Sequence, residues 1–547
     1  MSGDRGRSVT ALPLPRDEAV ASLQGDTFDV VIVGGGITGS YVALDATLRG
    51  YKVALIEKED FASGTSSKSS KMVHGGLRYI EQGNLRLVRH SLLERQRLRE
   101  NASHLVERLP FVFPVLKEGG AVNRRLSGGF GALLRTYDSL GGKREGVLHQ
   151  RLTVAEVTRY CPTLNPENVL HGYLFYDART DDARLTLNVA RTAARYGATV
   201  VNHAKVTQVV RADGKVVGVE VDVDGSTIRV ASSAVIMATG VWLHTWTGAA
   251  AGVRTPSLRP AKGVHIVVPW HKVRNDACVT IPLDETRNAI AYRWGDFTVL
   301  GTTDDDYTGD LDEVACTREE MLLMVNALRR AFNDDIRESD VLGTMAGCRP
   351  LVASSATTTR EVSRSHEIRT DPDGMVTVVG GKLTIGRHMA ELTVDRLERV
   401  LGKRDRCQTR DRYLLGGANY DAQSVLATGG IAAHLGGRYG SESGLVSAIM
   451  QERPETMTKI VAGLPYTEAE VIFAVRYEMA QTVDDVLSRR TRSRFLSRDA
   501  SAEAAARVAE IMGIELAWSA QAIAASASDY MQRVAKEKAI LEAVRVS

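Results

Sequence analysis

Three glycines, Gly34, Gly36 and Gly39, have a spacing that lets the backbone approach the pyrophosphate of a dinucleotide. The first glycine permits a tight turn, the second removes a side chain beside the phosphates, and the third allows close helix packing. Glu57 follows at the sequence separation usual for a carboxylate that binds a ribose hydroxyl. An ordinary glycine turn is the alternative, but the glycines and the acid together favour a dinucleotide site.

The segment 62–71 is dense in hydroxyl side chains, and His74, Gly75 and Gly76 follow it. Hydroxyl groups and backbone amides placed directly after a strand can bind the polar parts of a nucleotide. Taken alone, the same composition also suits a flexible loop. Both interpretations of this segment stay open on composition.

The elements around the glycines are those that such a site requires. Residues 28–33 form a β-branched run typical of a strand buried in a parallel sheet. A helix should follow the glycines as far as Gly50, and residues 52–57 supply a second strand, which completes a βαβ unit. Other expected helices and strands follow along the chain: helical patterns at 85–108, 183–196, 317–332 and 384–402, and strands at 198–206, 216–223, 227–230, 234–240 and 375–381, with shorter strands between 257 and 345.

Composition limits the class of protein. The 547 residues carry a formal charge of only +3, which does not imply a nucleic-acid partner. Five widely separated cysteines fit neither a disulfide framework nor a metal site, so we expect a reducing, cytoplasmic compartment. No apolar run is long enough to span a membrane, and residues 1–25 lack the apolar core of a signal peptide.

The segment TSSKSSKMVHGGLRYIEQGNLRLV, residues 65–88, resembles the flavin-contacting segment of FAD-dependent glycerol-3-phosphate dehydrogenases, within the glycine-oxidase and D-amino-acid-oxidase superfamily. Further motifs of this family occur in family order: residues 176–185, 262–267, 301–310, 347–351, 363–366, 380–384, 474–480 and 487–492. The resemblance implies an α/β fold in which an FAD-binding Rossmann-like domain carries an inserted mixed-sheet substrate domain and a C-terminal all-helical domain.

The expected organisation has three parts. A flexible tail covers 1–25, the FAD-dependent oxidoreductase region covers 26–410, and the helical domain covers 411–547. Within the second part, cofactor and substrate segments alternate: cofactor segments at about 26–110, 170–256 and 346–410, and substrate or cap segments at about 111–169 and 257–345.

The resemblance also implies the site residues. The FAD-binding set is Gly34, Gly36, Gly39, Glu57, Thr65, Ser66, Ser67, Ser69, Lys71, His74, Gly75, Gly76, Leu77, Val206, Gly240 and Thr384. Oxidation of a secondary alcohol by flavin needs a base and an anchor that aligns the reacting carbon. The expected catalytic residues are His265, Arg349 and Lys382, and the expected substrate ligands are Arg78, Tyr79 and Arg364.

Each of these polar residues has a simpler structural interpretation. His265, the candidate base, could be a satisfied core histidine, and any one arginine could form a surface ion pair. Arg349 could assist the base or replace it. Lys382 and Thr384 could stabilise the anionic reduced flavin. The run Asp304–Asp306 looks like a metal site, but the family resemblance treats it as structural, and we expect no metal.

Two positions depart from the family pattern. Tyr41 stands where the family has glycine after the glycine motif, and Ile385-Gly386 stands before Arg387 where the family has a Tyr-Arg pair. The first departure bears on helix packing near the pyrophosphate. The second bears on the substrate, because that segment should lie beside the flavin.

The expected activity is FAD-dependent oxidation of sn-glycerol 3-phosphate to dihydroxyacetone phosphate, with quinone as electron acceptor. A basic and apolar mixture in 111–150 suits the surface of an anionic membrane, so we expect a cytoplasmic protein attached peripherally to the cytoplasmic membrane. An ordinary solvated loop is the alternative for that stretch. An oxidase that uses O₂ and a flavin-binding relative without turnover are the alternative functions, and the helical domain could serve a homodimer or another partner.

Overall fold

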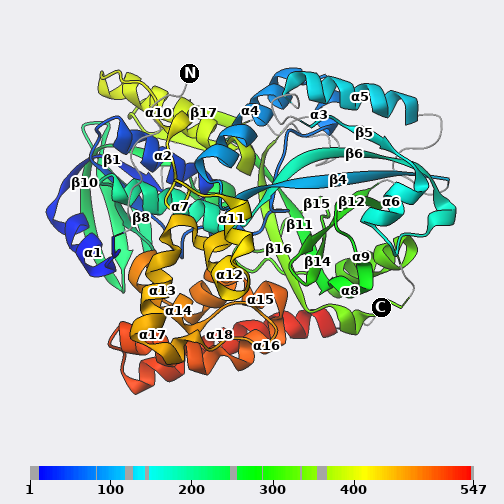
Figure 1. Cartoon of the computed structure of the whole chain (residues 1–547). Coiled ribbons are helices and arrows are strands. Elements are labelled where there is room, and N and C mark those ends of the chain that lie inside the picture. The colour runs from blue at the N-terminus through cyan, green and yellow to red at the C-terminus, as the bar shows by residue number, and fades with distance from the viewer. Residues whose placement is uncertain are drawn as a thin grey trace.

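The computed structural model describes residues 12–81, 83–117, 127–141, 147–246, 256–285, 287–332, 335–353 and 366–543. Two β-sheets lie side by side, and the C-terminal helices pack across the base of both (Figure 1). This is the expected α/β architecture with a mixed second sheet and a helical C-terminal part.

The first sheet has the strand order β17-β18-β10-β1-β2-β7, and its five strands from β18 to β7 run parallel. The expected βαβ unit is present as β1, α2 and β2. Helices α2, α7 and α10 pack on one face, while α1 and the strands β8 and β9 cover apolar residues of the other. The elements are β1 (Thr27–Val33), α2 (Ile37–Leu48), β2 (Val53–Ile56), α7 (Asp182–Arg195), β7 (Thr199–Val201), β8 (Ala204–Ala212), β9 (Lys215–Val223), β10 (Ser226–Met237), β17 (His366–Thr370), β18 (Val376–Gly380) and α10 (Gly386–Leu401).

The second sheet has the order β15-β11-β14-β13-β12-β4-β6-β3, with β16 beside β11 and β5 beside β6. It is mixed, because β12 pairs with β4 in parallel while the other pairs are antiparallel. Its elements are β3 (Met72–Val73), α3 (Arg78–Glu81), α4 (Leu85–Asn101), β4 (Val106–Leu116), α5 (Ser127–Leu140), β5 (Gln150–Leu152), α6 (Val154–Tyr160), β6 (Val169–Thr180), β11 (Leu258–Pro269), α8 (Trp270–Val273), β12 (Cys278–Pro282), β13 (Asn288–Trp294), β14 (Phe297–Gly301), β15 (Asp305–Asp306), α9 (Arg318–Ala331) and β16 (Gly343–Val352).

The sheet boundaries differ from the expected segments at several points. The helical pattern over 85–108 ends at Asn101, and β4 begins at Val106. Strands β6 and β16 belong to the second sheet although much of each was expected in a cofactor segment. Segments expected to belong to the cofactor domain therefore also contribute long strands to the second sheet.

The N-terminal segment expected to be a flexible tail contains a helix. Residues Arg16–Gly25 form α1, whereas residues 1–11 lie outside the described part. Leu23 is fully buried against the first sheet, and Arg16 binds Asp224 with a 2.8 Å Nη1–Oδ2 contact. Burial of one apolar side chain and this ion pair attach the helix to the sheet.

The stretch expected on a membrane surface packs largely inward where it is described. Phe111, Phe130 and Leu134 are buried in one apolar cluster beneath the second sheet. Arg135 is exposed on α5, while Arg124 and Arg125 lie outside the described residues. Most of the aromatic content that suggested lipid contact is therefore core packing.

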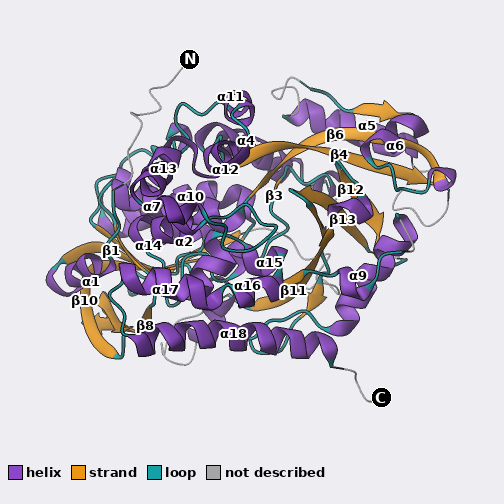
Figure 2. Cartoon of the chain, turned by 60° about the horizontal axis from the view of Figure 1, so that its bottom comes forward, coloured by secondary structure: helices purple, strands orange, loops and turns teal. Residues whose placement is uncertain are grey.

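The C-terminal residues form a helical layer that crosses the molecule. Its last helix, α18, runs along one edge beneath α16 and α17 (Figure 2). Leu541 near its end reaches the apolar cluster of the second sheet. The helices are α11 (Ala422–Ala427), α12 (Gly430–Tyr439), α13 (Ser443–Glu452), α14 (Glu468–Glu478), α15 (Ser493–Leu496), α16 (Arg498–Glu503), α17 (Ala505–Glu515) and α18 (Ala520–Glu542), with a π-helical turn at Asp485–Arg490.

Across the described residues, none of the helices combines the length and the apolar character needed to cross a bilayer.

Candidate active site

A cavity of about 580 Å³ opens where the parallel strands of the first sheet end. Its walls come from the glycine loop after β1, the residues after β2, the hydroxyl-rich segment and the turn after β18. This is the edge of a parallel α/β sheet at which ligands bind. The expected cofactor residues on its wall are Gly34, Gly36, Glu57, Thr65, Ser66, Ser69, Val206 and Gly240.

The glycine loop has the geometry for which side chains would be excluded. Gly34 has φ +111°, and a Cβ added there would lie 2.6 Å from the Ala238 carbonyl oxygen. Gly39 is not on the cavity wall: an added Cβ would lie 1.9 Å from the Gly34 carbonyl oxygen. The third glycine therefore packs α2 against the loop that the first glycine turns.

Glu57 ties the same loop in place. Its Oε2 accepts a 2.6 Å hydrogen bond from Gly35 N, and its Oε1 accepts one of 3.0 Å from Glu59 N. Burial raises the pKa of this carboxyl, while the two amide donors oppose the shift. The side chain also borders the cavity, so binding of a ribose hydroxyl stays a prediction for a residue that already shapes the loop.

The hydroxyl-rich segment is fixed by hydrogen bonds, which removes the flexible-loop interpretation. Ser66 Oγ accepts from Ile37 N at 2.9 Å, Thr65 Oγ1 donates to the Cys348 carbonyl at 2.6 Å, and Ser69 Oγ donates to Asp182 at 2.7 Å. These bonds join the segment to the N-terminus of α2, to β16 of the second sheet and to the N-terminus of α7. One segment thus connects the two sheets along the cavity.

Other expected cofactor residues lie behind this wall rather than on it. Lys71 is fully buried and binds Asp182 with a 2.8 Å ion pair, while burial and the nearby Arg492 lower the pKa of this lysine to about 8. His74 N donates to Thr384 Oγ1 at 3.2 Å, and Gly75 N donates to Tyr137 Oη at 2.9 Å. The residues placed behind the wall are Ser67, Lys71, His74, Gly75, Gly76, Leu77 and Thr384. Their contacts with the flavin stay predictions.

The cavity fits a bound dinucleotide. An added Cβ at Gly36 would approach Ser66 Oγ to 3.1 Å, so the absence of a side chain there keeps the space open for phosphate. Thr239 Oγ1 lies in this wall, is buried, and has no hydrogen-bond partner among the described residues. The neighbouring N-terminus of α2 favours negative charge. These features match the pyrophosphate and ribose hydroxyls of FAD.

Three residues that the sequence analysis did not identify close one side of the cavity. Lys58 lies 4.4 Å from the centre of the Trp242 ring, and both Lys58 Nζ and Trp242 Nε1 bind Asp312 Oδ1, at 2.7 and 2.9 Å. All three line the cavity. They come from three segments distant in the sequence, and no local motif predicts their contact.

On the expected substrate side, Lys382 is the catalytic candidate that reaches the cavity wall. Its ammonium lies 4.7 Å from the centre of the Tyr79 ring. Two of the predicted residues, from segments three hundred residues apart, are therefore brought together. The side chains of Arg78 and Arg364 lie outside the described part of the structure.

His265 is buried behind the hydroxyl-rich segment. Its exposed fraction is 1%, and its Nε2 lies 3.0 Å from Ser70 Oγ. Burial holds the pKa of this imidazole well below its usual value, and the charges of Lys71 and Arg349 lower it further. The ring is neutral at physiological pH, but it does not reach the described cavity wall, so its role as base stays a prediction.

Arg349 lies on β16, whose next residue, Pro350, borders the cavity. Its guanidinium donates to Asp304 at 3.1 Å and to Thr302 Oγ1 at 2.9 Å. The neighbouring acids are paired as well: Asp305 binds Arg287 at 2.9 Å and Asp306 binds Arg259 at 2.5 Å. The acidic run therefore forms an ion-paired edge that orients Arg349.

The two departures from the family pattern meet in space. A Cβ at Gly386 would lie 3.0 Å from Ile37 Cγ1 and 3.7 Å from the Tyr41 ring, and Tyr41 is 3% exposed. The tyrosine on α2 thus fills space beside the N-terminus of α10, where a side chain on residue 386 would extend. Arg387 points into a buried network with Glu94, at 2.6 and 2.7 Å.

We therefore expect the pair to behave as one unit. Tyr41→Gly should cost about 3–5 kcal/mol through the cavity it leaves, and Gly386→Tyr should also destabilise through overpacking against Ile37. The double variant should lose about 1–3 kcal/mol less unfolding free energy than the sum of the two single losses. Urea unfolding provides the measurement.

Combining Gly386→Tyr with Tyr530→Gly, which removes a buried ring on α18, should give additive changes as the control. If the effects of Tyr41→Gly and Gly386→Tyr on stability are additive, the two residues do not share one space and the interpretation is wrong.

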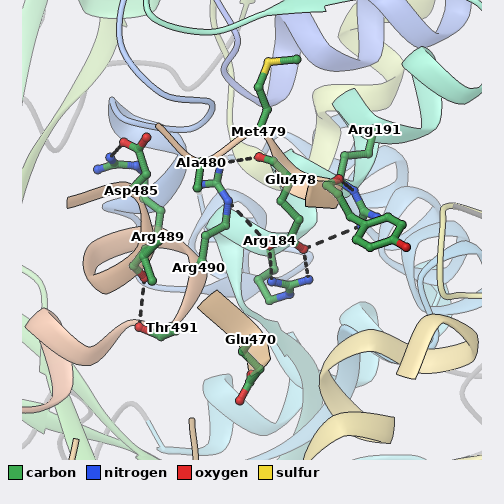
Figure 3. Close-up of polar contacts among 12 residues, drawn as sticks. Arg184, Arg191, Glu470, Glu478, Met479, Ala480, Asp485, Arg489, Arg490 and Thr491 are labelled. Atoms are coloured by element: carbon green, nitrogen blue, oxygen red, sulfur yellow. Dashed lines mark hydrogen bonds and ion pairs between the residues drawn. The ribbon is translucent and has the colours of Figure 1, made fainter. Parts of the chain in front are cut away.

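Behind the hydroxyl-rich segment, the C-terminal helices supply a set of buried ion pairs (Figure 3). Glu478, with no exposed surface, accepts from Arg184 at 2.6 Å, and Arg490 binds Asp60 at 2.6 Å. Arg492 binds Asp181 at 2.8 Å and donates to the Ser67 carbonyl at 3.2 Å. The helical domain therefore braces the cofactor cradle directly. The residues of these ion pairs include members of the motifs at 176–185 and 487–492, but the sequence does not show that the two motifs are in contact.

Comparisons with known proteins agree with this arrangement. Residues 29–396 match the family model described as FAD dependent oxidoreductase, and residues 407–523 match the C-terminal domain of alpha-glycerophosphate oxidase. Glycerol-3-phosphate dehydrogenase 2 of Mycobacterium tuberculosis is 35% identical over 98% of this chain and 93% of its own length. A mitochondrial glycerol-3-phosphate dehydrogenase of Arabidopsis thaliana is 33% identical over 100% of this chain and 91% of its own length.

Two solved structures share the architecture. The glycerol-3-phosphate dehydrogenase from Bacillus halodurans, complexed with FAD, has a TM-score of 0.76 and 26% identity, covering 96% of this chain and 97% of its own. An L-alpha-glycerophosphate oxidase from Mycoplasma pneumoniae with FAD bound has a TM-score of 0.56 at 17% identity, covering 71% and 98%, a likeness in fold alone.

Proposed function

Since the chain belongs to the family of FAD-dependent glycerol-3-phosphate dehydrogenases, we propose that it oxidises sn-glycerol 3-phosphate to dihydroxyacetone phosphate. The observation that carries this proposal is one cavity lined both by the glycine loop and by Lys382, whose ammonium lies beside Tyr79. It combines a predicted dinucleotide cradle with a cationic side chain, as an enzyme for a phosphorylated alcohol requires.

Bound FAD would accept the hydride from the secondary carbon of the substrate. Lys382 would place a positive charge on the cavity wall, where it could stabilise the negative charge of the reduced flavin. Hydrogen bonds to Asp304 and Thr302 fix the orientation of the Arg349 guanidinium. Arg78, Tyr79 and Arg364 remain the predicted substrate ligands, the two arginines binding the phosphate through charge-assisted hydrogen bonds.

For the hydroxyl proton we propose His265 as acceptor, a residue that lies behind the described cavity wall and not on it. Its Nδ1 has no hydrogen-bond partner among the described residues, so this nitrogen is open to accept a proton. Burial keeps the imidazole neutral but, by lowering its pKa, also makes it a weaker base than a free histidine. For Nδ1 to accept the proton, Nε2 must carry the ring hydrogen and donate it to Ser70 Oγ, which lies 3.0 Å away and fixes the ring. Arg349 is the alternative helper at this step.

For the electron acceptor, we propose quinone at the cytoplasmic membrane surface, with the protein attached peripherally. The support for an acceptor other than O₂ is that the curated relatives spanning nearly the whole chain are named dehydrogenases. The likeness to glycerophosphate oxidases comes from the family model of the C-terminal domain and from the fold of a solved structure. Transfer to O₂ is the alternative.

Steady-state assays with a short-chain ubiquinone analogue separate these acceptors. Under nitrogen, the FAD-loaded protein should form dihydroxyacetone phosphate and reduced quinone in equal amounts. In air without quinone, peroxide should form at less than a tenth of that rate. Peroxide formation at the full rate in air would instead identify an oxidase. That result would contradict the proposed acceptor but not the proposed oxidation of glycerol 3-phosphate.

A further inference from the structure

A second cavity of about 560 Å³ lies where β6, the N-terminus of α7, the turn between β13 and β14, and the helical domain meet. Its inner wall includes Arg438, Tyr466 and Asp181, and its outer part includes Lys459 and Asp296. None of the residues assigned to FAD or substrate lines it. Its volume suits a small organic ligand.

Arg438 is 9% exposed and lies 4.9 Å from the centre of the Tyr466 ring. Its Nε and Nη2 have no hydrogen-bond partner among the described residues. The nearest acids are at ion-pair distance only, Glu470 at 3.4 Å and Asp181 at 3.6 Å. A buried guanidinium usually makes several hydrogen bonds, so this one retains unused donor capacity.

Both neighbouring acids have other partners. Asp181 binds Arg492 with a 2.8 Å ion pair. Glu470 contacts His434 Nε2 at 3.1 Å, accepts from Tyr439 Oη at 3.0 Å and from Thr467 N at 2.8 Å. The charge of Arg438 is therefore only partly balanced by its surroundings.

The other charges of the lining are largely compensated, and one cation and one acid are left over. Arg184 binds Glu478 at 2.6 Å, and Arg179 binds Glu107 at 2.6 Å. Within the described residues, Lys459 and Asp296 have no ion-pair partner, and both are exposed at the opening. With Arg438 inside, the uncompensated charge of the lining is positive.

We propose that this cavity binds a small organic anion, a phosphate monoester or a carboxylate, with the anionic group on Arg438 and Lys459. Arginine suits both groups because its planar donors match two oxygens of either. Trp294, Phe297 and Tyr466 provide aromatic surface for the rest of the ligand. Such a ligand would contact both the second sheet and the helical domain.

Isothermal titration calorimetry of the FAD-loaded protein with inorganic phosphate and with citrate tests the site. Saturable binding of one or both should be lost by tenfold or more in Arg438→Gln and weakened in Lys459→Gln. Arg438→Lys should recover part of the affinity. The matched control is Arg453→Gln, since this arginine of the same domain pairs with Glu515 outside the cavity.

The two probes distinguish the ligand class: phosphate alone indicates a phosphate ester, and citrate alone a carboxylate. Circular dichroism and the flavin spectrum show whether Arg438→Gln remains folded, and Lys459→Gln, at the exposed opening, decides if it does not. Phosphate binding that persists in both variants belongs to the substrate site and overturns the proposal. No saturable binding of either anion overturns it as well.

Discussion

Gly34→Ala should yield protein with less than a tenth of the FAD content of the wild type. The residue has φ +111°, where an alanine is strained by about 1–3 kcal/mol. The added Cβ would also lie 2.6 Å from the Ala238 carbonyl, so the loop must move away from β10. Because this loop lines the cavity where we predict the pyrophosphate to bind, its displacement should remove the cradle. Cofactor content after purification, from absorbance and heat-released FAD, provides the measurement.

Gly25→Ala is the matched control, because a Cβ there meets no atom within 4 Å and the backbone conformation is ordinary. This variant should retain full FAD content. A Gly34→Ala protein that remains fully loaded with FAD would show that the loop does not shape the cofactor site.

Glu478→Ala should lower the free energy of unfolding by about 3–5 kcal/mol, because it leaves the buried Arg184 without its counter-charge and removes a second carboxylate from Arg490 and Arg191. Glu478 has no exposed surface, and it lies 2.6 Å from Arg184, 3.6 Å from Arg490 and 3.8 Å from Arg191. Figure 3 shows these side chains converging from α7 and the helical domain. Thermal melting of the FAD-loaded protein, followed by circular dichroism, measures the loss.

Two further variants separate the charge from the carboxylate shape. Glu478→Gln should also be strongly destabilised, since the amide keeps the volume but not the charge. Glu455→Ala, which removes an exposed partner of Arg453, should change stability by less than about 1 kcal/mol. Equal effects of the buried and exposed substitutions would contradict the account of a buried ionic brace.

The cofactor half of the fold could be predicted because its signals are local. A buried β-branched strand, glycines at fixed spacing and an acid at the end of the next strand lie within thirty residues and form one βαβ unit. The hairpin around Asp224–Gly225 follows from equally local turn chemistry. The place of β6 in the second sheet could not be predicted, because β6 pairs with β4 and β3 across large sequence separations.

The candidate site shows the same division. Gly34, Gly36 and Ser66 line the cavity, and their contacts with FAD stay predictions, whereas Lys71 is a buried partner of Asp182. Composition cannot distinguish a lysine that faces a ligand from one that neutralises a buried acid. The proximity of Tyr41 to Gly386 could not be predicted either, because nothing local in the sequence shows that α2 packs against α10.

The buried ion pairs between the helical domain and the cofactor cradle could not be predicted from the sequence. The region after 411 was expected to be a separate helical domain, yet Arg490 and Arg492 reach Asp60, Asp181 and Ser67 at the back of the cradle. Charged residues in helices usually face solvent. Only the three-dimensional arrangement shows that these arginines are buried opposite acids of the first sheet region.

An anaerobic reductive titration tests the central claim most directly. Stepwise addition of sn-glycerol 3-phosphate to the FAD-loaded protein should bleach the visible flavin band, and dihydroxyacetone phosphate should form in equal amount with the flavin reduced. Glycerol lacks the phosphate and should leave the band largely unchanged at the same concentration. A flavin that dithionite reduces but sn-glycerol 3-phosphate does not would contradict the assignment of this cavity to the oxidation of glycerol 3-phosphate.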